Sequence, residues 1–276
     1  KVPHALEIRD LWPESIIELG SIRKNSLIIK ILNKIARYIY KKSNLIVVVT
    51  NSFKEYLLKI NIDENKIIVI ENGFNFDKTL VPNKTAQMIS EEYNIDKNKF
   101  IVSYTGTIGI SHGLEIIIQA AELLNDVLFL VIGEGAEKKS LKKIKEQKKI
   151  KNVLFIDSVN WQEIVNINQI VDANLIHLRN LALFKTVIPS KIFESMALKK
   201  PILAGLIGES IEIVIKSNSG LKIIPENPNS LLENILHLRS NPEMLERMGD
   251  NGFNFVKKKY NRKVLAYQMI QAINTI

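Results

Sequence analysis

Short apolar runs, many of them rich in β-branched residues, alternate with longer amphipathic stretches along almost the whole chain. Such runs predict buried strands, and apolar residues three and four apart predict helices. The predicted strands cover residues 5–8, 45–50, 67–70, 100–105, 127–132, 153–157, 173–178, 201–204 and 221–224. The predicted helices cover residues 26–42, 51–60, 113–125, 136–149, 161–169, 190–198, 209–217, 228–240 and 242–258. Continuously apolar strands separated by helices indicate an α/β fold with parallel sheets covered on both faces.

A polar stretch containing Pro82 separates two strand–helix series and is interpreted as a linker. The series after it makes a doubly wound, Rossmann-like domain, which binds ligands at the carboxyl ends of its strands. Only three strands precede the linker, and they would form half a sheet with an unpaired edge strand. Because the chain also begins with Lys1, we expect the beginning of the first domain to be missing. The expected divisions are 1–82, 83–98, 99–258 and 259–276.

Composition narrows the class of protein. The 276 residues include no Cys, which excludes disulfides, thiolate metal sites and a cysteine nucleophile. No apolar run is long enough to span a membrane, and no secretory signal opens the chain. The net charge of +9 suits nucleic acid, an anionic membrane or a phosphorylated substrate, although the lysines of 138–151 predict a solvated helix face. Nucleic acid is not an expected partner, because no recognition motif or aromatic–basic platform is present.

Two glycine-containing loops follow predicted strands at the same edge of the sheet. Residues 106–113 read GTIGISHG, and Gly133 and Gly135 flank Glu134 after the next strand. Glycines let backbone N–H groups approach a phosphate at a helix start. The spacing is not the dinucleotide fingerprint, so NAD is not indicated. A tight strand-to-helix turn explains the glycines at least as well, and Glu134 is better explained by a favourable position at a helix start than by a ligand contact.

The most informative segment is residues 189–197, PSKIFESMA. Pro189 and Ser190 are typical of a helix start, where Ser can cap the helix. Free N–H groups there can bind an anion, and Lys191 adds a positive charge. Glu194, one turn later, can accept two hydrogen bonds from the vicinal hydroxyls of a ribose. A capped surface helix with Lys and Glu facing water explains these residues equally well.

This segment, followed by Lys200-Pro201-Ile202 and Gly208-Glu209, resembles the signature of glycosyltransferase family 4, in the branch that makes O-antigen, capsule and related glycans. Further matches occur in the family's order, at Arg9-Asp10-Leu11-Trp12-Pro13-Glu14, Ile70-Glu71-Asn72-Gly73, Tyr104-Thr105-Gly106 through His112-Gly113-Leu114, Val131-Ile132-Gly133-Glu134-Gly135 and Asn152-Val153-Leu154-Phe155. The ordered series covers the chain from about His4 to the last helix.

The resemblance implies a GT-B fold, in which two Rossmann-like, doubly wound parallel-sheet domains face each other across a cleft, the first one being incomplete here. Residues 99–258 would bind a nucleotide-sugar donor, and residues 259–276 would return to the first domain. Transfer would retain the anomeric configuration and need no metal or other cofactor, because helix dipoles and cations stabilise the leaving diphosphate.

The resemblance also assigns roles to residues. Glu194 matches the second glutamate of the family's Glu-x7-Glu motif, which holds the ribose, and Val159 falls where the backbone contacts the base. Thr107 and His112 occupy positions where many members carry Arg and Lys against the phosphates. The implied donor site comprises Gly106, Thr107, Gly109, His112, Gly133, Val159, Pro189, Ser190, Lys191 and Glu194. The implied catalytic residues are Glu194, Lys191, Arg9 and Asp10, and no metal ligand is implied.

The chain departs from the family at the phosphates. Thr186 replaces the first glutamate of the motif, Thr107 carries no charge, and His112 is expected to be mostly neutral near neutral pH unless a phosphate raises its pKa. Lys191 is therefore the best candidate for the compensating cation.

Arg9 stands where many members have His before Asp, at a strand end that would face the cleft. It can contact the donor's sugar or phosphate. Its simplest alternative role is an ion pair with Asp10 or Glu7.

The predicted helix 26–42 is amphipathic and basic. Its apolar positions are Leu27, Ile28, Ile31, Leu32, Ile35 and Ile39, and its basic positions are Lys30, Lys34, Arg37, Lys41 and Lys42. Such a helix can lie on an anionic membrane or pack on the sheet. We expect the apolar stripe to pack on the sheet, with the lysines left for the membrane. Trp12 is likewise expected to be buried rather than an interfacial anchor.

These observations predict a cytoplasmic glycosyltransferase, associated with the inner face of the plasma membrane, that moves a hexosyl or N-acetylhexosaminyl group. The donor would be a nucleoside diphosphate sugar, UDP-linked, and the acceptor a lipid-linked saccharide of bacterial surface polysaccharide. The alternative is a fragment that binds nucleotide sugar without turnover unless a missing segment or partner chain completes it.

Overall fold

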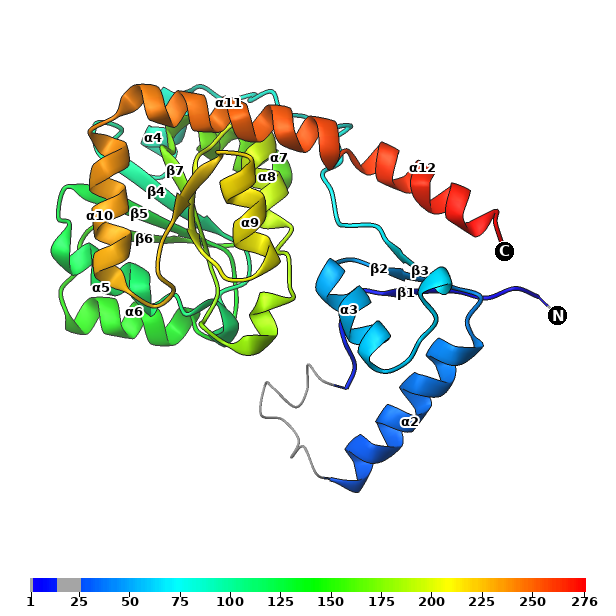
Figure 1. Cartoon of the computed structure of the whole chain (residues 1–276). Coiled ribbons are helices and arrows are strands. Elements are labelled where there is room, and N and C mark those ends of the chain that lie inside the picture. The colour runs from blue at the N-terminus through cyan, green and yellow to red at the C-terminus, as the bar shows by residue number, and fades with distance from the viewer. Residues whose placement is uncertain (1, 14–25) are drawn as a thin grey trace.

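The computed structural model describes residues 2–13 and 26–276. Figure 1 shows two lobes, each built on its own parallel sheet. All nine predicted strands are present, with ends within two residues of those expected. The predicted α/β class is confirmed.

The first lobe has three parallel strands in the order β1 (Ala5–Ile8), β2 (Leu45–Val48) and β3 (Ile67–Val69). Helix α3 (Asn51–Lys59) starts directly after β2, and the Thr50 hydroxyl caps it by accepting from the Phe53 N–H at 3.2 Å. Phe53 and Leu57 then bury their side chains against the sheet. The strand end, the cap and the apolar spacing thus fix the N-terminus of α3 at the carboxyl edge of this sheet.

The second lobe holds a six-stranded parallel sheet in the order β6-β5-β4-β7-β8-β9. Its strands are β4 (Phe100–Thr105), β5 (Val127–Ile132), β6 (Val153–Ile156), β7 (Ala173–His177), β8 (Ile202–Gly205) and β9 (Gly220–Lys222). From β4 the strand order runs outward in one direction through β6, and from β7 it runs outward in the other. The loops after β4 and β7 therefore diverge, and this switch point is where doubly wound sheets bind ligands.

Helices cover both faces of the six-stranded sheet. They are α4 (Ala86–Glu92), α5 (Glu115–Leu123), α6 (Lys138–Gln147), α7 (Trp161–Ile167), α8 (Lys191–Ala197), α9 (Glu209–Lys216), α10 (Pro228–Arg239) and α11 (Pro242–Lys259). Neighbouring residues of β4 enter different clusters, with Val102 among the residues of α5 and α10 and Ile101 beside Ile89 of α4. Because successive strand residues point to opposite faces, this alternation shows that both faces are buried.

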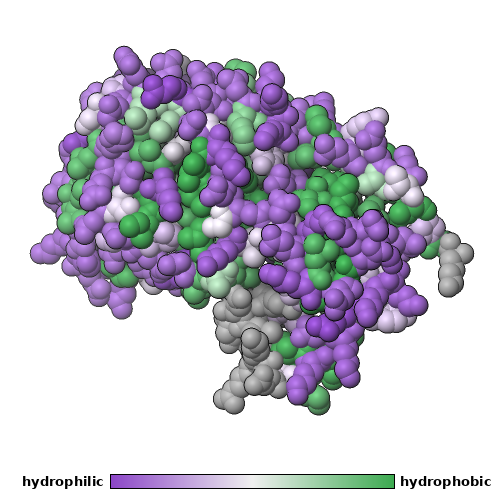
Figure 2. Space-filling model, in the orientation of Figure 1, coloured by the Kyte–Doolittle hydropathy of each residue, from purple (hydrophilic) through white to green (hydrophobic). Residues whose placement is uncertain are grey.

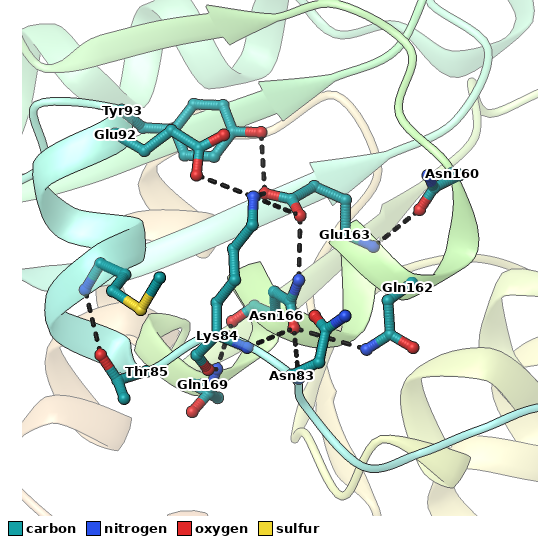
Figure 3. A network of polar contacts seen from close by, with 11 residues as sticks. Asn83, Lys84, Thr85, Glu92, Tyr93, Asn160, Gln162, Glu163, Asn166 and Gln169 are labelled. Atoms are coloured by element: carbon teal, nitrogen blue, oxygen red, sulfur yellow. Dashed lines mark hydrogen bonds and ion pairs between the residues drawn. The ribbon is translucent and has the colours of Figure 1, made fainter.

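The polar pattern does not predict α4. Its Ile89 is fully buried in the second lobe's core. Figure 3 shows how polar contacts attach the preceding segment to α4 and α7, since Lys84 pairs with Glu92 of α4 at 2.8 Å and with Glu163 of α7 at 2.9 Å. Burial acts to raise the Glu163 pKa, but hydrogen bonds from Asn166, Lys84 and Tyr93 hold it below its ordinary value. The segment from Lys84 through α4 therefore packs as part of the second lobe.

Two of the contacts that connect the lobes involve backbone hydrogen bonds of the described residues. The backbone at Phe74 bridges that at Asn261, because Phe74 N–H donates to Tyr260 O at 2.8 Å and Arg262 N–H donates to Phe74 O at 2.9 Å. Helix α12 (Arg262–Ile273) starts at this bridge and runs from α11 past the first lobe (Figure 1). At the second contact, the Glu209 carboxylate on α9 accepts from the Ser52 N–H at 2.6 Å and the Asn51 N–H at 3.0 Å.

Two expectations about apolar residues in the first lobe are wrong. Helix α2 (Leu27–Lys42) buries Ile29 and Tyr40 but leaves Leu27 73% and Ile28 58% exposed, because the face turned to the sheet lies about one residue around the helix from the predicted stripe. Trp12, expected to be buried, is 54% exposed. The lower end of the first lobe in Figure 2, where α2 lies, accordingly shows hydrophobic residues beside hydrophilic ones.

Among the lysines of 138–151, Lys138 is an exception to the predicted solvated face. It is buried, and its ammonium pairs with Glu134 at 2.5 Å and Asp157 at 2.6 Å. Glu134, in the loop before α6, thus pairs with Lys138 at the start of that helix. No helix of residues 2–13 and 26–276 is long and apolar enough to cross a bilayer.

Candidate functional site

Helix α8 begins at Lys191, beside the loops that end β4 and β7. Ser190 does not cap it as predicted, because Ser190 is already in the helical conformation and its side chain makes no cap hydrogen bond. Ile192 N–H donates to Pro189 O at 3.1 Å, and Phe193 N–H donates to Ser190 O at 3.0 Å. Among the described residues, the N–H groups of Ser190 and Lys191 make no hydrogen bond. They are therefore donors without a protein partner among the described residues.

The Lys191 side chain points to the loop after β4. Its ammonium donates to the Tyr104 hydroxyl at 2.6 Å, and that hydroxyl donates to the Thr107 carbonyl at 2.5 Å. Burial lowers the pKa of Lys191 to about 8, although nearby Glu194 acts to raise it. Sequence reasoning missed Tyr104 as a partner, because its position in a strand gives no sign that its hydroxyl reaches the loop.

The glycines at this edge are required by close packing. Gly106 has a φ of +125°, and a side chain there would overlap the Lys191 side chain. A side chain at Gly133, whose φ is +142°, would collide with the Gly106 carbonyl. Gly109, by contrast, has room for a methyl group. The tight-turn explanation therefore accounts for Gly106 and Gly133, and the close approach lets Lys191 lie under the loop.

Neither residue at the family's phosphate-contacting positions carries a charge in the free protein. Thr107 is exposed. Burial and the nearby Lys191 charge lower the pKa of His112 to about 4. The backbone carbonyl of His112 accepts from His177 Nδ1 at 2.6 Å, and His177 Nε2 accepts from the Glu226 N–H at 2.9 Å. These partners fix His177 as the neutral Nδ1–H tautomer, so neither imidazole supplies a positive charge at neutral pH.

Glu194 faces two cavities. The first, of about 40 Å³, lies within the second lobe and is also lined by Lys191 and Asn174. The second, of about 290 Å³, lies between the lobes and is lined by Ser190, Glu194, Arg9, Asn72, Gly73, Phe74, Asn75, Lys78 and Arg262. The Glu194 carboxylate accepts no hydrogen bond from the described residues. It is an unengaged acceptor on the wall of a groove between the lobes.

Arg9 reaches the same groove from the end of β1. Its guanidinium pairs with Glu7 at 3.0 Å and donates to Asn72 Oδ1 at 2.7 Å, so the simpler ion-pair role is present together with a place on the cavity wall. Asp10 is exposed and is not among the residues that line this cavity. The structure therefore brings Arg9, but not Asp10, to Glu194.

Other predicted site residues lie outside the interlobe cavity. Val159, after β6, packs at the edge of a core cluster. Pro189 precedes α8 without lining the cavity, and Thr186 donates its hydroxyl to the Leu183 carbonyl at 2.8 Å. In residues 2–13 and 26–276, no three His, Asp or Glu side chains gather as metal ligands would. Sequence reasoning missed Lys78 and Arg262, which match no motif.

The family model for glycosyl transferases group 1 matches residues 85–255, well over half of the chain. This chain belongs to that family. The probable glycosyltransferase WbjE of Pseudomonas aeruginosa is 26% identical over 233 residues, which are 82% of this chain and 57% of WbjE. The chain thus spans little more than half of that relative.

Two solved structures share the fold of this group 1 chain. Anabaena Alr3699/HepE, solved in complex with UDP, has a TM-score of 0.81 at 15% identity, covering 99% of this chain and 72% of that one. WaaG, described as a glycosyltransferase involved in lipopolysaccharide biosynthesis, has a TM-score of 0.73 at 13% identity, covering 96% and 75%. The two parallel sheets are therefore arranged as in GT-B glycosyltransferases.

Proposed function

We propose that this chain is the donor-binding part, with a portion of the acceptor side, of a retaining glycosyltransferase. It would move a sugar from a UDP-linked donor to a lipid-linked saccharide in bacterial surface polysaccharide synthesis. The UDP bound to Alr3699/HepE and the lipopolysaccharide role of WaaG support the donor and the pathway class. Residues 99–258 would carry the donor, and α12 would return the chain to the first lobe.

The observation that carries this proposal is the unengaged Glu194 carboxylate on the interlobe cavity. A carboxylate there can accept hydrogen bonds from both hydroxyls of a ribose, which are hydrogen bonds to a charged group and correspondingly strong. The free N–H groups of Ser190 and Lys191 lie one turn away and can donate to the diphosphate. Gly106, Thr107, Gly109, His112 and Gly133 would form the opposite wall of this site, and the backbone at Val159 would meet the base.

Cations of this chain would stabilise the leaving diphosphate without a cofactor. The Lys191 ammonium is held by Tyr104 beneath the loop after β4, and Arg9 stands across the cavity. A cation in a partly dry cleft stabilises developing negative charge more than it would in water. Asp10, which does not line the cavity, would need a movement of its loop to take part.

Glu194→Ala tests the proposal. We expect calorimetry to show at least a tenfold loss of affinity for UDP and for uridine, because two hydrogen bonds to a charged acceptor together exceed about 1.4 kcal/mol. Glu233→Ala, an exposed glutamate on α10, is the matched control. Equal affinity of Glu194→Ala and wild type would remove the ribose assignment.

A second candidate is a fragment that binds nucleotide sugar without turnover. It is favoured by the 57% share of WbjE that the chain covers. Sugar release from UDP- and GDP-sugars, measured for this chain alone, separates the two. Release by this chain alone rejects the second candidate.

The lipid-linked acceptor suggests contact with an anionic membrane. Helix α2 exposes Ile31 and Ile35, each 50% exposed, and carries basic but no acidic residues. A helix of this kind can lie in the interface of an anionic bilayer, at the inner face of the plasma membrane. Co-sedimentation with vesicles tests this contact.

A further inference from the structure

The interlobe cavity collects positive charge from three separate segments. Arg9 follows β1, Lys78 lies in the crossover between the lobes, and Arg262 begins α12. Glu194 is the single carboxylate among the described lining residues, so three cations and one anion leave the wall with a formal charge of +2. The first and last of these cations are far apart in the sequence, and only the joint between the lobes brings them together.

Backbone hydrogen bonds hold the joint itself together. The bridge between Phe74 and Asn261 holds the crossover against the start of α12 with two backbone hydrogen bonds of 2.8 and 2.9 Å. A side chain at Gly73 would collide with the Tyr260 carbonyl, so the close approach needs glycine. Arg262 and the segment of Lys78 are therefore positioned by backbone contacts, not by their own side chains.

These cations are only partly neutralised by the protein. Arg9 pairs with exposed Glu7 at 3.0 Å, and the Lys78 ammonium lies 4.8 Å from the centre of the Trp161 ring. Arg262 has no ion pair among the described residues, whereas the next residue, Lys263, pairs with Asp77 at 2.6 Å. Like charges around one cavity repel one another, and a bound anion would relieve that repulsion.

The opposite wall does not offer this charge. Thr107 is uncharged, and His112 is neutral at physiological pH because burial and Lys191 lower its pKa to about 4. The cations that line the cavity therefore all come from the first lobe, the crossover and the start of α12. This distribution differs from one in which all cations stand on the donor lobe.

We propose that Arg262 and Lys78, with Arg9, bind a phosphate group in the interlobe cavity. The inference rests on the proposed function in placing a nucleotide at Glu194. The phosphate belongs either to the donor's diphosphate or to the phosphorylated lipid of the acceptor, which share the same chemistry. Arg262 offers a planar pair of donors that suits phosphate oxygens, and Lys78 adds a point charge.

Arg262→Gln and Lys78→Gln test the inference, with Lys263→Gln as the matched control beside the cavity. Both target side chains are exposed, so the fold does not depend on them. Calorimetry would use uridine, UDP, inorganic pyrophosphate and geranyl diphosphate. We expect about a tenfold loss for a phosphate ligand and none for uridine, because one charge-assisted contact is removed.

The ligand that loses affinity identifies the source. A loss for UDP assigns the cavity to the donor, and a loss confined to geranyl diphosphate assigns it to the acceptor. Unchanged affinity for every phosphate ligand, or an equal loss in Lys263→Gln, overturns the inference. Failure of the proposed function gives a different result, because the wild type would then bind neither uridine nor UDP. The affinity for inorganic pyrophosphate would still show whether Arg262 and Lys78 bind a phosphate group.

Discussion

The two lobes are built from the same strand–helix pattern but bury it to different extents. In the second lobe, β4 has a neighbour on each side, and Ile101 and Val102, on opposite faces, are each 1% exposed. In the first lobe, β2 is equally buried, yet β1 has one neighbour among the described residues and α2 leaves its outer apolar face open. Periodicity predicts which residues can be buried, but the number of neighbouring elements decides which ones are.

The lobes also contribute different kinds of charge to the groove. The second lobe supplies the Glu194 carboxylate to the groove. The partly buried Lys191, whose pKa burial lowers to about 8, lines the smaller cavity that Glu194 also faces. The first lobe and its joint supply the exposed cations Arg9, Lys78 and Arg262. A partly buried cation that is held by a hydrogen bond can be aimed at one atom, while exposed cations attract an anion at longer range but are screened by salt.

The largest expected effect is on the stability of the first lobe, because one residue of the second lobe, Glu209, holds the start of α3. Glu209→Ala removes the acceptor that holds the N–H groups of Asn51 and Ser52 at the start of α3. Hydrogen bonds to a charged group contribute about 2–3 kcal/mol here, so hydrogen exchange across residues 45–59 should quicken by a factor of about 30 to about 160. Exchange across residues 100–132 should not change.

Glu212→Ala, one turn further along α9, is the control, because the ion pair that Glu212 makes among the described residues is with Lys216 on the same helix, at 4.0 Å. If protection of α3 survives Glu209→Ala, the first lobe is ordered by its own core and the difference between the lobes is smaller than their burial suggests.

A change on α2 tests whether the open face of the first lobe meets a membrane. Ile35→Glu should reduce binding to anionic vesicles about tenfold, because it removes an apolar contact and places a negative charge among basic residues worth about 1 kcal/mol each at the surface. Ile270→Glu is the matched control, since Ile270 is 55% exposed but lies on α12, away from the α2 lysines. Equal losses in the two variants, or no binding by the wild type, would reject α2 as the contact.

The sequence predicts the strands well and the site only partly. Runs such as 100–105 are apolar throughout and bounded by polar residues, so local pattern suffices to find β4. Glu194 and Lys191 could be selected because helix-start chemistry and a family motif coincide there.

Arg262 and Lys78 could not be found in this way. Their convergence depends on the backbone bridge between Phe74 and Asn261, which has no local signature. The exposed side of α2 was missed for a similar reason. A rotation of about one residue around the helix, set by the packing of Ile29 and Tyr40, decides which apolar positions face solvent.

The smallest expected effect is a change of UDP affinity with pH, which would distinguish Lys191, the partly buried cation of the second lobe, from the exposed cations of the first lobe and the joint. Burial lowers the folded-state pKa of Lys191 to about 8, so this ammonium loses its proton as the pH rises through that value. If a bound diphosphate keeps Lys191 protonated, UDP affinity should fall about fourfold between about pH 7 and about pH 8.5, because the free protein must then take up a proton to bind. Uridine affinity, measured in parallel, corrects for ionisation of the base.

Lys191→Met should abolish this pH dependence. Arg262→Gln should keep it, since a guanidinium is charged throughout the range and its loss does not change with pH. A UDP affinity that is flat with pH in the wild type would place the diphosphate away from Lys191 and leave the exposed cations as its partners.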